Sequence, residues 1–521
     1  MTKERKNLSA KGMISSIKKT FMESNKDYAI MNSSFPISDC LLSGLALFGL
    51  KFPSLLQFEE QANKAGLIKK NLKSLYQIKN VPSDTYLRER LDEVNPDVIK
   101  KNFKKLFALA QRGNVLKEYS HLDGYYLMPM DMTGFFSSPS VKCENCCIKQ
   151  NIRSKVQVGH SLPKNTKKVS IGTYLLIYSH LHWSCYYVGK DKKLITIALE
   201  TVPGLQEMLE GCIPEVFFDA KLKSLKELIA LYHDEQHQED VSYYHNMMCA
   251  VIAHPDKSQV IPFAPEAVIK SDGSKKNDCE RKAGKRLISD IRREHPHLKL
   301  IAVQDSIASN YPNLNQLKEA NIRFITGAKP GDHKHLFSYV EANPCLEYEH
   351  QTDDGKHHRY RYINDAPLNA KHHDFKVNFI EYWETDKKGR TKHFSWVTDI
   401  MLTESNVYEI MRGGRTNWKI ENNTFNTLKN QDYHFSHNFG HGYKNLSTVF
   451  GTLMLLAFMI DQLQELACGL FKAARNSYRS KISFWNDMQN IFKKYVVHSW
   501  EDLWSAIAFG HNEPELKPNT S

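Results

Sequence analysis

The sequence lacks a run of apolar residues long enough to span a membrane. Its longest apolar stretch, from Val449 to Ile460, is interrupted by Gly451 and Thr452 and stops at Asp461. That is well short of the roughly 20 residues that cross a bilayer as a helix. The charged N-terminus is not followed by an apolar segment, which argues against a secretory signal. We therefore expect a cytoplasmic protein in which this stretch forms a buried helix.

Internal repeats, low-complexity segments and a regular cysteine framework are also missing. The chain has 25 glycines and 19 prolines among 521 residues, too few for a low-complexity polymer. Its ten cysteines are scattered, unlike the dense cysteines of small secreted domains, and this suits a reducing compartment. With 41% hydrophobic and 25% charged residues, the composition is that of a globular protein of two to four domains.

Basic residues outnumber acidic residues in this chain. Seventy Lys and Arg residues stand against 58 Asp and Glu residues, a formal net charge of +12. This excess favours an anionic partner such as nucleic acid, although it names no reaction. The first 30 residues form a loosely basic arm, which is either a solvated tail or a contact to phosphates.

The hydrophobic pattern changes from helical to strand-like along the chain. Residues 36–113 read as helices, whereas residues 125–130 read as a buried strand that leads into Asp131, with Thr133 and Gly134 as the turn after it. Residues 243–254 and 259–269 look like a hairpin. A helix up to residue 294 and a strand over 298–303 follow, and Asp305 stands just past that strand.

A second alternating unit and two unusual segments complete the pattern. Residues 313–320 and 322–325 read as a helix and a strand, residues 331–400 as mainly strands, and residues 405–504 as mainly helices. Residues 159–240 interrupt the core with a pattern of their own, which we interpret as an inserted α+β unit.

Three acidic residues occupy places where open α/β proteins put functional groups. Asp131 and Asp305 end two strands, and Glu421 lies on a late helix. A single aspartate at a strand end is commonly a turn cap or an ion-pair partner. Three carboxylates that converge are instead a suitable ligand set for Mg²⁺ or Mn²⁺. Two such ions support an in-line displacement at a phosphodiester.

Several strings of residues form a recognisable set with these acids. They are Pro53-Ser54-Leu55-Leu56-Gln57-Phe58, Asp278-Cys279-Glu280-Arg281, Trp418-Lys419-Ile420-Glu421-Asn422 continuing through Phe425-Asn426-Thr427-Leu428-Lys429-Asn430, and His437-Asn438-Phe439-Gly440-His441-Gly442. From about residue 35 to residue 470, the chain resembles bacterial DDE transposases of the insertion-sequence four group.

The resemblance implies a fold and an activity. The expected fold is α/β, with a ribonuclease-H-like core that carries a β-rich insertion and is preceded and followed by helical regions. Asp131, Asp305 and Glu421 would be the catalytic and metal-binding triad for Mg²⁺ or Mn²⁺. The partners would be double-stranded DNA, namely transposon terminal repeats and target DNA, and a second copy of the chain in a synaptic homodimer. The expected activity is cleavage of transposon ends and strand transfer.

The same resemblance divides the chain into five parts. They are an N-terminal helical region expected to bind DNA (1–118), the first part of the core with its inserted segment at about 159–240 (119–330), the β-rich insertion (331–400), the helical end of the core with the glutamate (401–476), and a C-terminal helical region with a polar tail (477–521).

The chain departs from the group's pattern at the acids. Met132 replaces a glycine after the first aspartate, which would cost backbone freedom in a tight turn, and the Tyr, Arg and Lys positions around the glutamate are not matched in register. DNA contacts therefore fall to neighbouring residues, Arg415, Trp418, Lys419 and Lys429. Trp418 lies one turn before Glu421, so it either packs in the core, its commoner role, or stacks on a base. These departures leave open a decayed or repurposed transposase that binds DNA without catalysis, or a metal-dependent nuclease.

A cysteine motif stands apart from the acids. Cys143, Cys146 and Cys147 contain one C-x-x-C, half of a structural zinc site, which His160 or His245 could complete. Since the chain has no second C-x-x-C, we expect reduced structural cysteines rather than zinc. His434, His437 and His441 are expected at the surface or facing DNA rather than as metal ligands.

Overall fold

The structure is a computed structural model that describes residues 7–30, 35–64, 66–151, 240–272, 276–353, 355–437 and 439–510. Contacts divide the chain into two units, residues 1–148 with 243–521, and residues 149–242. The predicted inserted segment at 159–240 lies almost wholly outside the described residues. The account below concerns the first unit.

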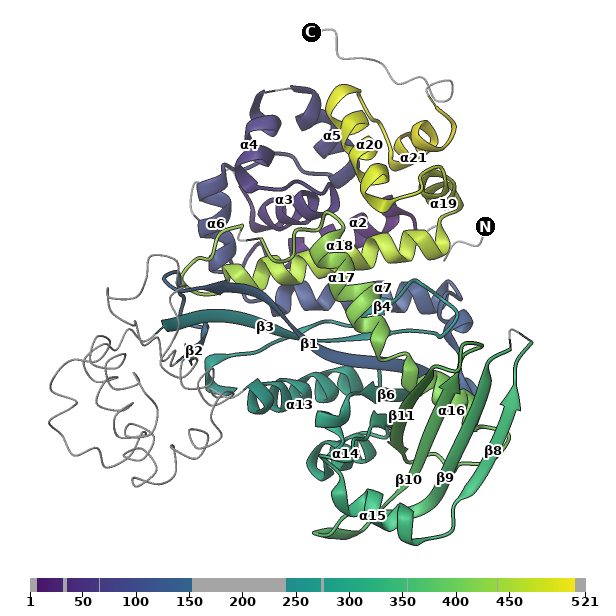
Figure 1. Cartoon of the computed structure of the whole chain (residues 1–521). Coiled ribbons are helices and arrows are strands. Elements are labelled where there is room, and N and C mark those ends of the chain that lie inside the picture. The colour runs from purple at the N-terminus through teal and green to yellow at the C-terminus, as the bar shows by residue number, and fades with distance from the viewer. Residues whose placement is uncertain are drawn as a thin grey trace, which may run out of the picture. The chain divides into compact units, whose positions relative to one another are not determined.

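Helices form the first part of the chain, as the pattern over residues 36–113 predicts (Figure 1). The helices are α2 (Ala10–Glu23), α3 (Ile37–Gly49), α4 (Leu55–Lys64), α5 (Gly66–Tyr76), α6 (Asp84–Asp92) and α7 (Asp97–Arg112), followed by the short 3-10 turns η1 (Leu116–Tyr119) and η2 (Leu122–Gly124). Polar side chains accept hydrogen bonds from the first backbone N–H groups of these helices. The Ser9 side chain accepts from the N–H of Gly12, and the Asn95 side chain accepts from the N–H of Asp97.

A large mixed sheet follows. Its strands are β1 (Tyr126–Ser138), β2 (Cys147–Asn151), β3 (Asp240–Ile252), β4 (Ile261–Pro262), β5 (Glu266–Ala267), β6 (Leu300–Gln304), β7 (Arg323–Gly327), β8 (Leu346–Gln351), β9 (His357–Asn369), β10 (His372–Thr385) and β11 (Thr391–Thr398). The order is β2-β3-β1-β6-β7-β11-β10-β9-β8, and β4 and β5 pair with β3. Strands β1, β6 and β7 run parallel, whereas β11 pairs with β7 antiparallel and opens a run of antiparallel strands.

Helices also cover the sheet and fill the C-terminal part of the chain. They are α13 (Lys276–Glu294), α14 (Tyr311–Glu319), α15 (Lys334–Ala342), α16 (Val407–Arg415), α17 (Asn426–Asn430), α18 (Leu446–Ala467), α19 (Gly469–Asn476), α20 (Lys481–Lys494) and α21 (Trp500–Phe509), with the short 3-10 turns η4 (Lys270–Asp272) and η5 (Ser306–Ala308) and the π-helical η6 (Ile420–Phe425).

The sheet separates two apolar clusters. Leu287 of α13 and Ala302 of β6 belong to the larger cluster. Ile410 of α16 and Val303 of β6 belong to the smaller cluster, on the other face. The parallel strands therefore lie between layers of helices, which explains why their sequences are almost continuously apolar.

The turn predicted at Thr133 and Gly134 is wrong. Strand β1 continues to Ser138, and these two residues pair with Met247 and Asn246 of β3. Asp131, predicted at the end of this strand, therefore lies within it and pairs with Cys249. The register shifts only after Gly134, before Phe136. Burial overrides the local turn signal, because the strand places the side chain of Phe135 inside the core.

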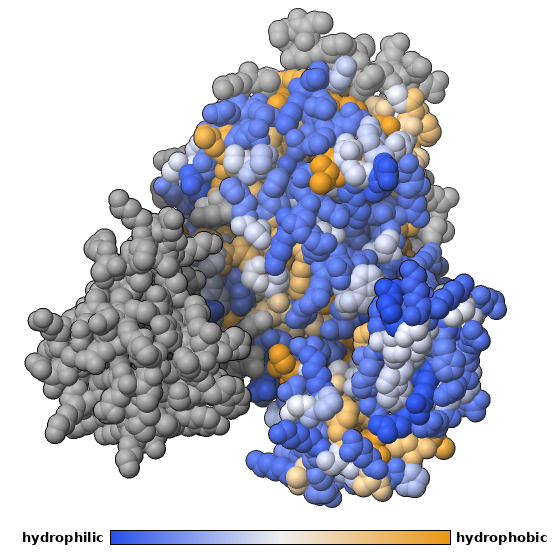
Figure 2. All heavy atoms as spheres, in the orientation of Figure 1, coloured by the Kyte–Doolittle hydropathy of each residue, from blue (hydrophilic) through white to orange (hydrophobic). Residues whose placement is uncertain are grey.

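The apolar stretch at residues 449–460 is a buried helix, as predicted. It forms the middle of α18, which is the described helix long and apolar enough to cross a membrane, and its apolar window is completely buried. Helices α3, α6 and α7 pack against it. Figure 2 shows a mainly hydrophilic face with scattered hydrophobic patches.

The N-terminal group of helices and the C-terminal group of helices share one core. The side-chain amide of Asn71 in α5 donates to the backbone carbonyls of Phe492 and Tyr495, at 2.8 and 2.7 Å. The indole of Trp500 donates to the carbonyl of Leu75 at 3.0 Å. In Figure 1 these purple and yellow helices lie side by side.

Candidate functional site

Asp131 and Asp305 lie level with each other on neighbouring parallel strands. Pro129 of β1 is paired with Val303 of β6, and each aspartate stands two residues further along its own strand direction. Strand β6 ends at Gln304, so Asp305 is the first residue past its carboxyl end. The carboxyl ends of parallel strands are where α/β proteins gather functional side chains.

Both aspartates also belong to the same face of the sheet. Leu127 and Val303 belong to the apolar cluster that α16 covers. Side chains on a strand alternate between faces with a period of two, so Asp131 and Asp305 share the face of Leu127 and Val303.

Local hydrogen bonds orient the two carboxylates. Asp305 caps η5, and its Oδ1 accepts from the backbone N–H groups of Ile307 and Ala308 at 3.0 and 3.4 Å. Asp131 is half-buried, and its Oδ1 accepts from the N–H of Met132 at 2.7 Å. Burial, followed by the charge of Asp131, raises the pKa of Cys249 on the opposite strand.

Met132 has the extended backbone of a strand, and it is paired with Met248. The glycine that the transposase group often carries here is therefore not needed for a left-handed backbone in this chain.

Glu421 comes from the helical path that crosses the same face. Helix α16 packs on β6 and β7, and the chain continues into η6, which contacts β1 (Figure 1). Ile420 is buried in the core, whereas Glu421 is exposed. A π-helical turn such as η6 is frequent at functional sites.

The three carboxylates do not form a close ligand cluster. Within the described residues, one group of His, Cys, Asp or Glu side chains places at least three ligand atoms close enough for a metal ion, and it contains none of these acids. The structure thus brings Asp131 and Asp305 to one level and η6 onto β1, without closing the three acids around a common point.

Two pockets flank the end of α16. One, of about 600 Å³, is lined by Asp305, Lys329, Trp396 and Asn417 among others. The other, of about 690 Å³, lies beside Asp256, Glu384 and Arg412. Arg415 and Trp418 line both pockets.

The four predicted DNA contacts differ in exposure. Trp418 is 49% exposed, so the expectation of core packing is wrong for this side chain. Lys429 is exposed, whereas Arg415 is half-buried, with its guanidinium 3.0 Å from a Glu384 oxygen. Lys419 is only 5% exposed, and its Nζ donates to the carbonyl of Lys257 at 2.6 Å. Burial lowers the pKa of Lys419.

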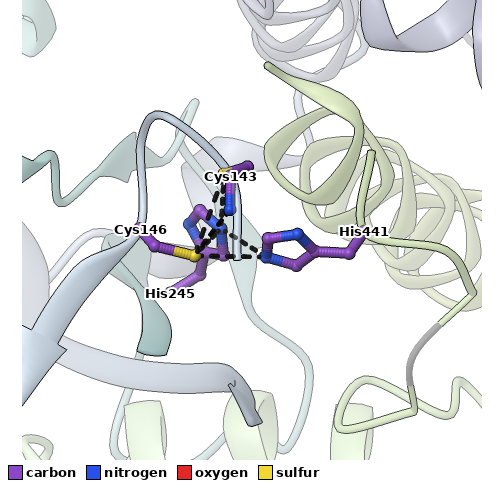
Figure 3. Close-up of side chains that lie close together, drawn as sticks. All are labelled: Cys143, Cys146, His245 and His441. Atoms are coloured by element: carbon purple, nitrogen blue, oxygen red, sulfur yellow. Dashed lines mark hydrogen bonds between the residues drawn. The ribbon is translucent and has the colours of Figure 1, made fainter. Parts of the chain in front are cut away.

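A compact cluster of two thiols and two imidazoles is formed by the segment between β1 and β2, by β3 and by the segment between α17 and α18. It consists of Cys143, Cys146, His245 and His441, whose ligand atoms all lie within 4.8 Å of one another (Figure 3). The hydrogen bond between the thiols lowers the pKa of Cys146 to about 7 and raises that of Cys143. Cysteine and histidine in this number are a ligand set that zinc accepts.

This cluster corrects two expectations from the sequence. His441, expected at the surface or facing DNA, is 5% exposed and lies inside the cluster. Cys147 lies outside it, with its Sγ 3.9 Å from the carbonyl of Val268. Of the two histidines proposed to complete the C-x-x-C motif, His245 belongs to the cluster, and His160 lies outside the described residues. No spacing rule in the sequence points to His441, because it lies 196 residues beyond His245.

No protein-family model matches the chain, and no curated protein matches it. Among solved structures, the chain is similar to the piggyBac transposase in the cryo-EM structure of its synaptic complex with hairpin DNA. The identity is 7% and the TM-score 0.34, over 95% of this chain and 77% of that one. Values this low do not establish a shared fold, so a function has to follow from the residues of this chain.

Proposed function

We propose that this chain is a metal-dependent DNA transposase of the DDE type, which cleaves transposon ends and joins them to target DNA. The supporting observation is the alignment of Asp131 and Asp305, two residues past a paired position on neighbouring parallel strands and on the face that α16 covers. The contact of η6 with β1 supports Glu421 as the third acid. The mixed sheet with helices on both faces is compatible with a ribonuclease-H-like core.

The donor chemistry of the three acids fits Mg²⁺ or Mn²⁺. All three side chains offer hard carboxylate oxygens, which these ions prefer, and none offers sulfur or nitrogen. Bound by Asp131, Asp305 and Glu421, such ions would supply activation of an attacking oxygen and charge stabilisation at the leaving oxygen. The exposure of Asp305 and Glu421 leaves their carboxylates accessible to a DNA backbone.

Residues around the two pockets would hold the DNA. Trp418 has an exposed ring one turn before Glu421, suited to stacking on an unpaired base. Arg415, held by Glu384, would offer its remaining N–H groups to a phosphate. Lys419 would instead position η6, because its Nζ is engaged by the carbonyl of Lys257.

The test is cleavage of the DNA that flanks the reading frame, with Mg²⁺ or Mn²⁺. Asp305→Asn should abolish strand cleavage while leaving DNA binding near that of the parent protein. Asp290→Asn is the matched control, because Asp290 is an aspartate on α13 that pairs with Arg293 at 2.6 Å and lies outside the proposed site. Retained cleavage by Asp305→Asn would refute the triad.

Two other functions remain distinguishable by product. A DNA-binding protein without catalysis is favoured by the finding that the three acids do not form the close ligand cluster, and it would bind the same DNA in both variants without cutting it. A nuclease would leave nicks, whereas a transposase would also yield target DNA joined to transposon ends. Under the proposal the protein acts as a homodimer on DNA in the bacterial cytoplasm.

A further inference from the structure

We propose that Cys143, Cys146, His245 and His441 bind one structural Zn²⁺ ion in a closed tetrahedral site. The site is separate from the three acids and stands on different observations, so it does not depend on the proposed transposase activity. Figure 3 shows the four side chains pointing toward one another from three different segments of the chain.

Five of the distances between ligand atoms lie within about 0.3 Å of the edges of a zinc tetrahedron. With zinc–sulfur distances of about 2.3 Å and zinc–nitrogen distances of about 2.0–2.1 Å, the edges are about 3.8 Å for S–S, about 3.6 Å for S–N and about 3.3 Å for N–N. The two Sγ atoms are 3.8 Å apart. Three of the four sulfur–nitrogen separations are 3.3, 3.4 and 3.3 Å, the fourth lies within 4.8 Å, and the two Nε2 atoms are 3.1 Å apart.

Hydrogen bonds alone do not account for this arrangement. The Nε2 atom of His245 lies 3.3 Å from the Cys143 sulfur, 3.4 Å from the Cys146 sulfur and 3.1 Å from the Nε2 of His441. An imidazole nitrogen has one proton or one lone pair in the ring plane, so it makes one good hydrogen bond there. A common metal ion explains all of these approaches together.

A disulfide is equally inconsistent with the distances. The sulfur atoms of Cys143 and Cys146 lie 3.8 Å apart, whereas a disulfide bond is about 2.05 Å long. Both thiols instead keep contacts with the imidazole of His245.

Surrounding groups set the tautomer of His441 and hold the ligand side chains in place. The Nδ1 of His441 lies 3.3 Å from the carbonyl oxygen of Gly442, so it would donate there and leave the lone pair of Nε2 for the metal. The ring of Phe136 packs against His441 with centroids 4.2 Å apart. His245 and Cys146 are both buried, at 2% exposure each.

The ligand set indicates both the metal and its role. Two sulfurs and two imidazoles suit Zn²⁺ and not the oxygen-seeking Mg²⁺ or Ca²⁺. Four protein ligands also fill a tetrahedral shell and leave no position for water or substrate, which is typical of a structural site rather than a catalytic one.

The ion would link three segments that are distant in the sequence. Cys143 and Cys146 lie between β1 and β2, His245 lies on β3 opposite Phe136 of β1, and His441 lies between α17 and α18. The interval from Cys146 to His245 is 99 residues, and that from His245 to His441 is 196 residues. Because such a site rarely exists in the unfolded chain, binding of zinc would stabilise the folded arrangement of these segments.

The linked segments connect the proposed zinc site to the proposed catalytic acids. The distal end of β1, the strand that carries Asp131, is held near the loop that follows η6 and α17. Direct contacts reinforce this connection, because the N–H of Glu144 donates to the carbonyl of Tyr443 at 3.0 Å and the Asn145 side chain donates to the carbonyl of Lys444 at 2.8 Å. Zinc would therefore hold the acid-bearing strand and the glutamate segment together from outside the site.

The first experiment measures metal in the full chain, purified without chelators, by elemental mass spectrometry. We expect about one zinc per chain. After removal of the metal, Co²⁺ should produce the intense visible bands of a tetrahedral ion together with thiolate-to-cobalt charge transfer. Absence of zinc from the parent protein, combined with no such spectrum on adding Co²⁺ or Zn²⁺ to the reduced chain, would overturn the proposal.

The variants assign the ligands. Cys146→Ala and His441→Ala should each lose most of the bound zinc, and a stronger loss of the charge-transfer band is expected for the cysteine variant. Cys147→Ala is the matched control, because its Sγ points to Val268, and it should keep a full equivalent of zinc. Loss of zinc in Cys147→Ala with retention in Cys146→Ala would refute the assignment. If a variant does not fold, the zinc content and cobalt spectrum of the parent still decide the proposal.

Discussion

Gly414 is expected to set the height of the glutamate-bearing helical path above the sheet. A Cβ atom added at this position in α16 would lie 2.6 Å from two ring atoms of Trp396 and 2.9 Å from a third. Trp396 is itself buried and stacked on Phe394, with ring centroids 5.8 Å apart, so it has little room to move away. Gly414→Ala should therefore lift the end of α16 rather than displace the indole.

The stability and activity effects of this substitution should differ in size. Overpacking a buried site costs roughly 1–3 kcal/mol. Replacing glycine by alanine inside a helix returns about 1 kcal/mol through helix propensity. We therefore expect a net destabilisation of at most about 2 kcal/mol. A displacement of the order of 1 Å at a catalytic group can cost about 100-fold in rate, so the loss of cleavage should be the larger effect. Glu421 lies seven residues further along the same helical path.

The assay compares DNA cleavage rate with unfolding free energy in urea for the same preparations. Gly284→Ala is the matched control, because Gly284 lies inside α13 and its added Cβ would meet only the terminal carbon of Met248, at 3.8 Å. This control should gain about 1 kcal/mol of stability and keep the parent's activity. A Gly414→Ala protein that cleaves as fast as the parent would refute the claim that this close approach positions Glu421.

Two further predictions concern stability. Lys51→Met should cost about 3–5 kcal/mol of unfolding free energy, because it leaves the buried carboxylate of Asp461, now 2.6 Å from Lys51 Nζ, without its cation. Adding Asp461→Leu to that variant should recover much of the loss, and equal unfolding midpoints for parent and single variant would contradict the account. Burial lowers the pKa of His295 to about 4 from an ordinary value of 6.5, so the unfolded chain binds more protons between these values. The contribution of neutral His295 to the free energy of unfolding is fully present above about pH 6.5 and should fall by about 3 kcal/mol as the pH drops to 4. The variant His295→Phe should show a weaker dependence of unfolding free energy on pH. An equal dependence in parent and variant would contradict this account.

Much of the fold could be predicted from local pattern. Apolar spacing and capping residues gave the helices over residues 36–113, the strand before Asp305 and the buried helix around residues 449–460. These elements were predictable because a helix or strand that buries one side repeats apolar residues at its own period. The location of Asp305 at a strand end follows from the same pattern.

Local pattern failed where distant residues decide the structure. At Thr133 and Gly134, pairing with β3 continues a strand that the sequence alone would end. Trp418 is exposed although tryptophan is usually buried, because the opposite side of its helical path, including Ile420, fills the core. Neither outcome can be read from neighbouring residues.

The sequence by itself determined that Asp305 follows the end of a strand, and it also determined the C-x-x-C pair and the net positive charge. The tertiary structure alone decided that Asp131 and Asp305 stand level on one face, since that depends on the register between β1 and β6. It also decided that His441 joins Cys143 and Cys146, because ligand atoms hundreds of residues apart meet only through the packing of the segments between them. Residue type fixes what a side chain can bind, whereas long-range packing fixes which side chains can bind together.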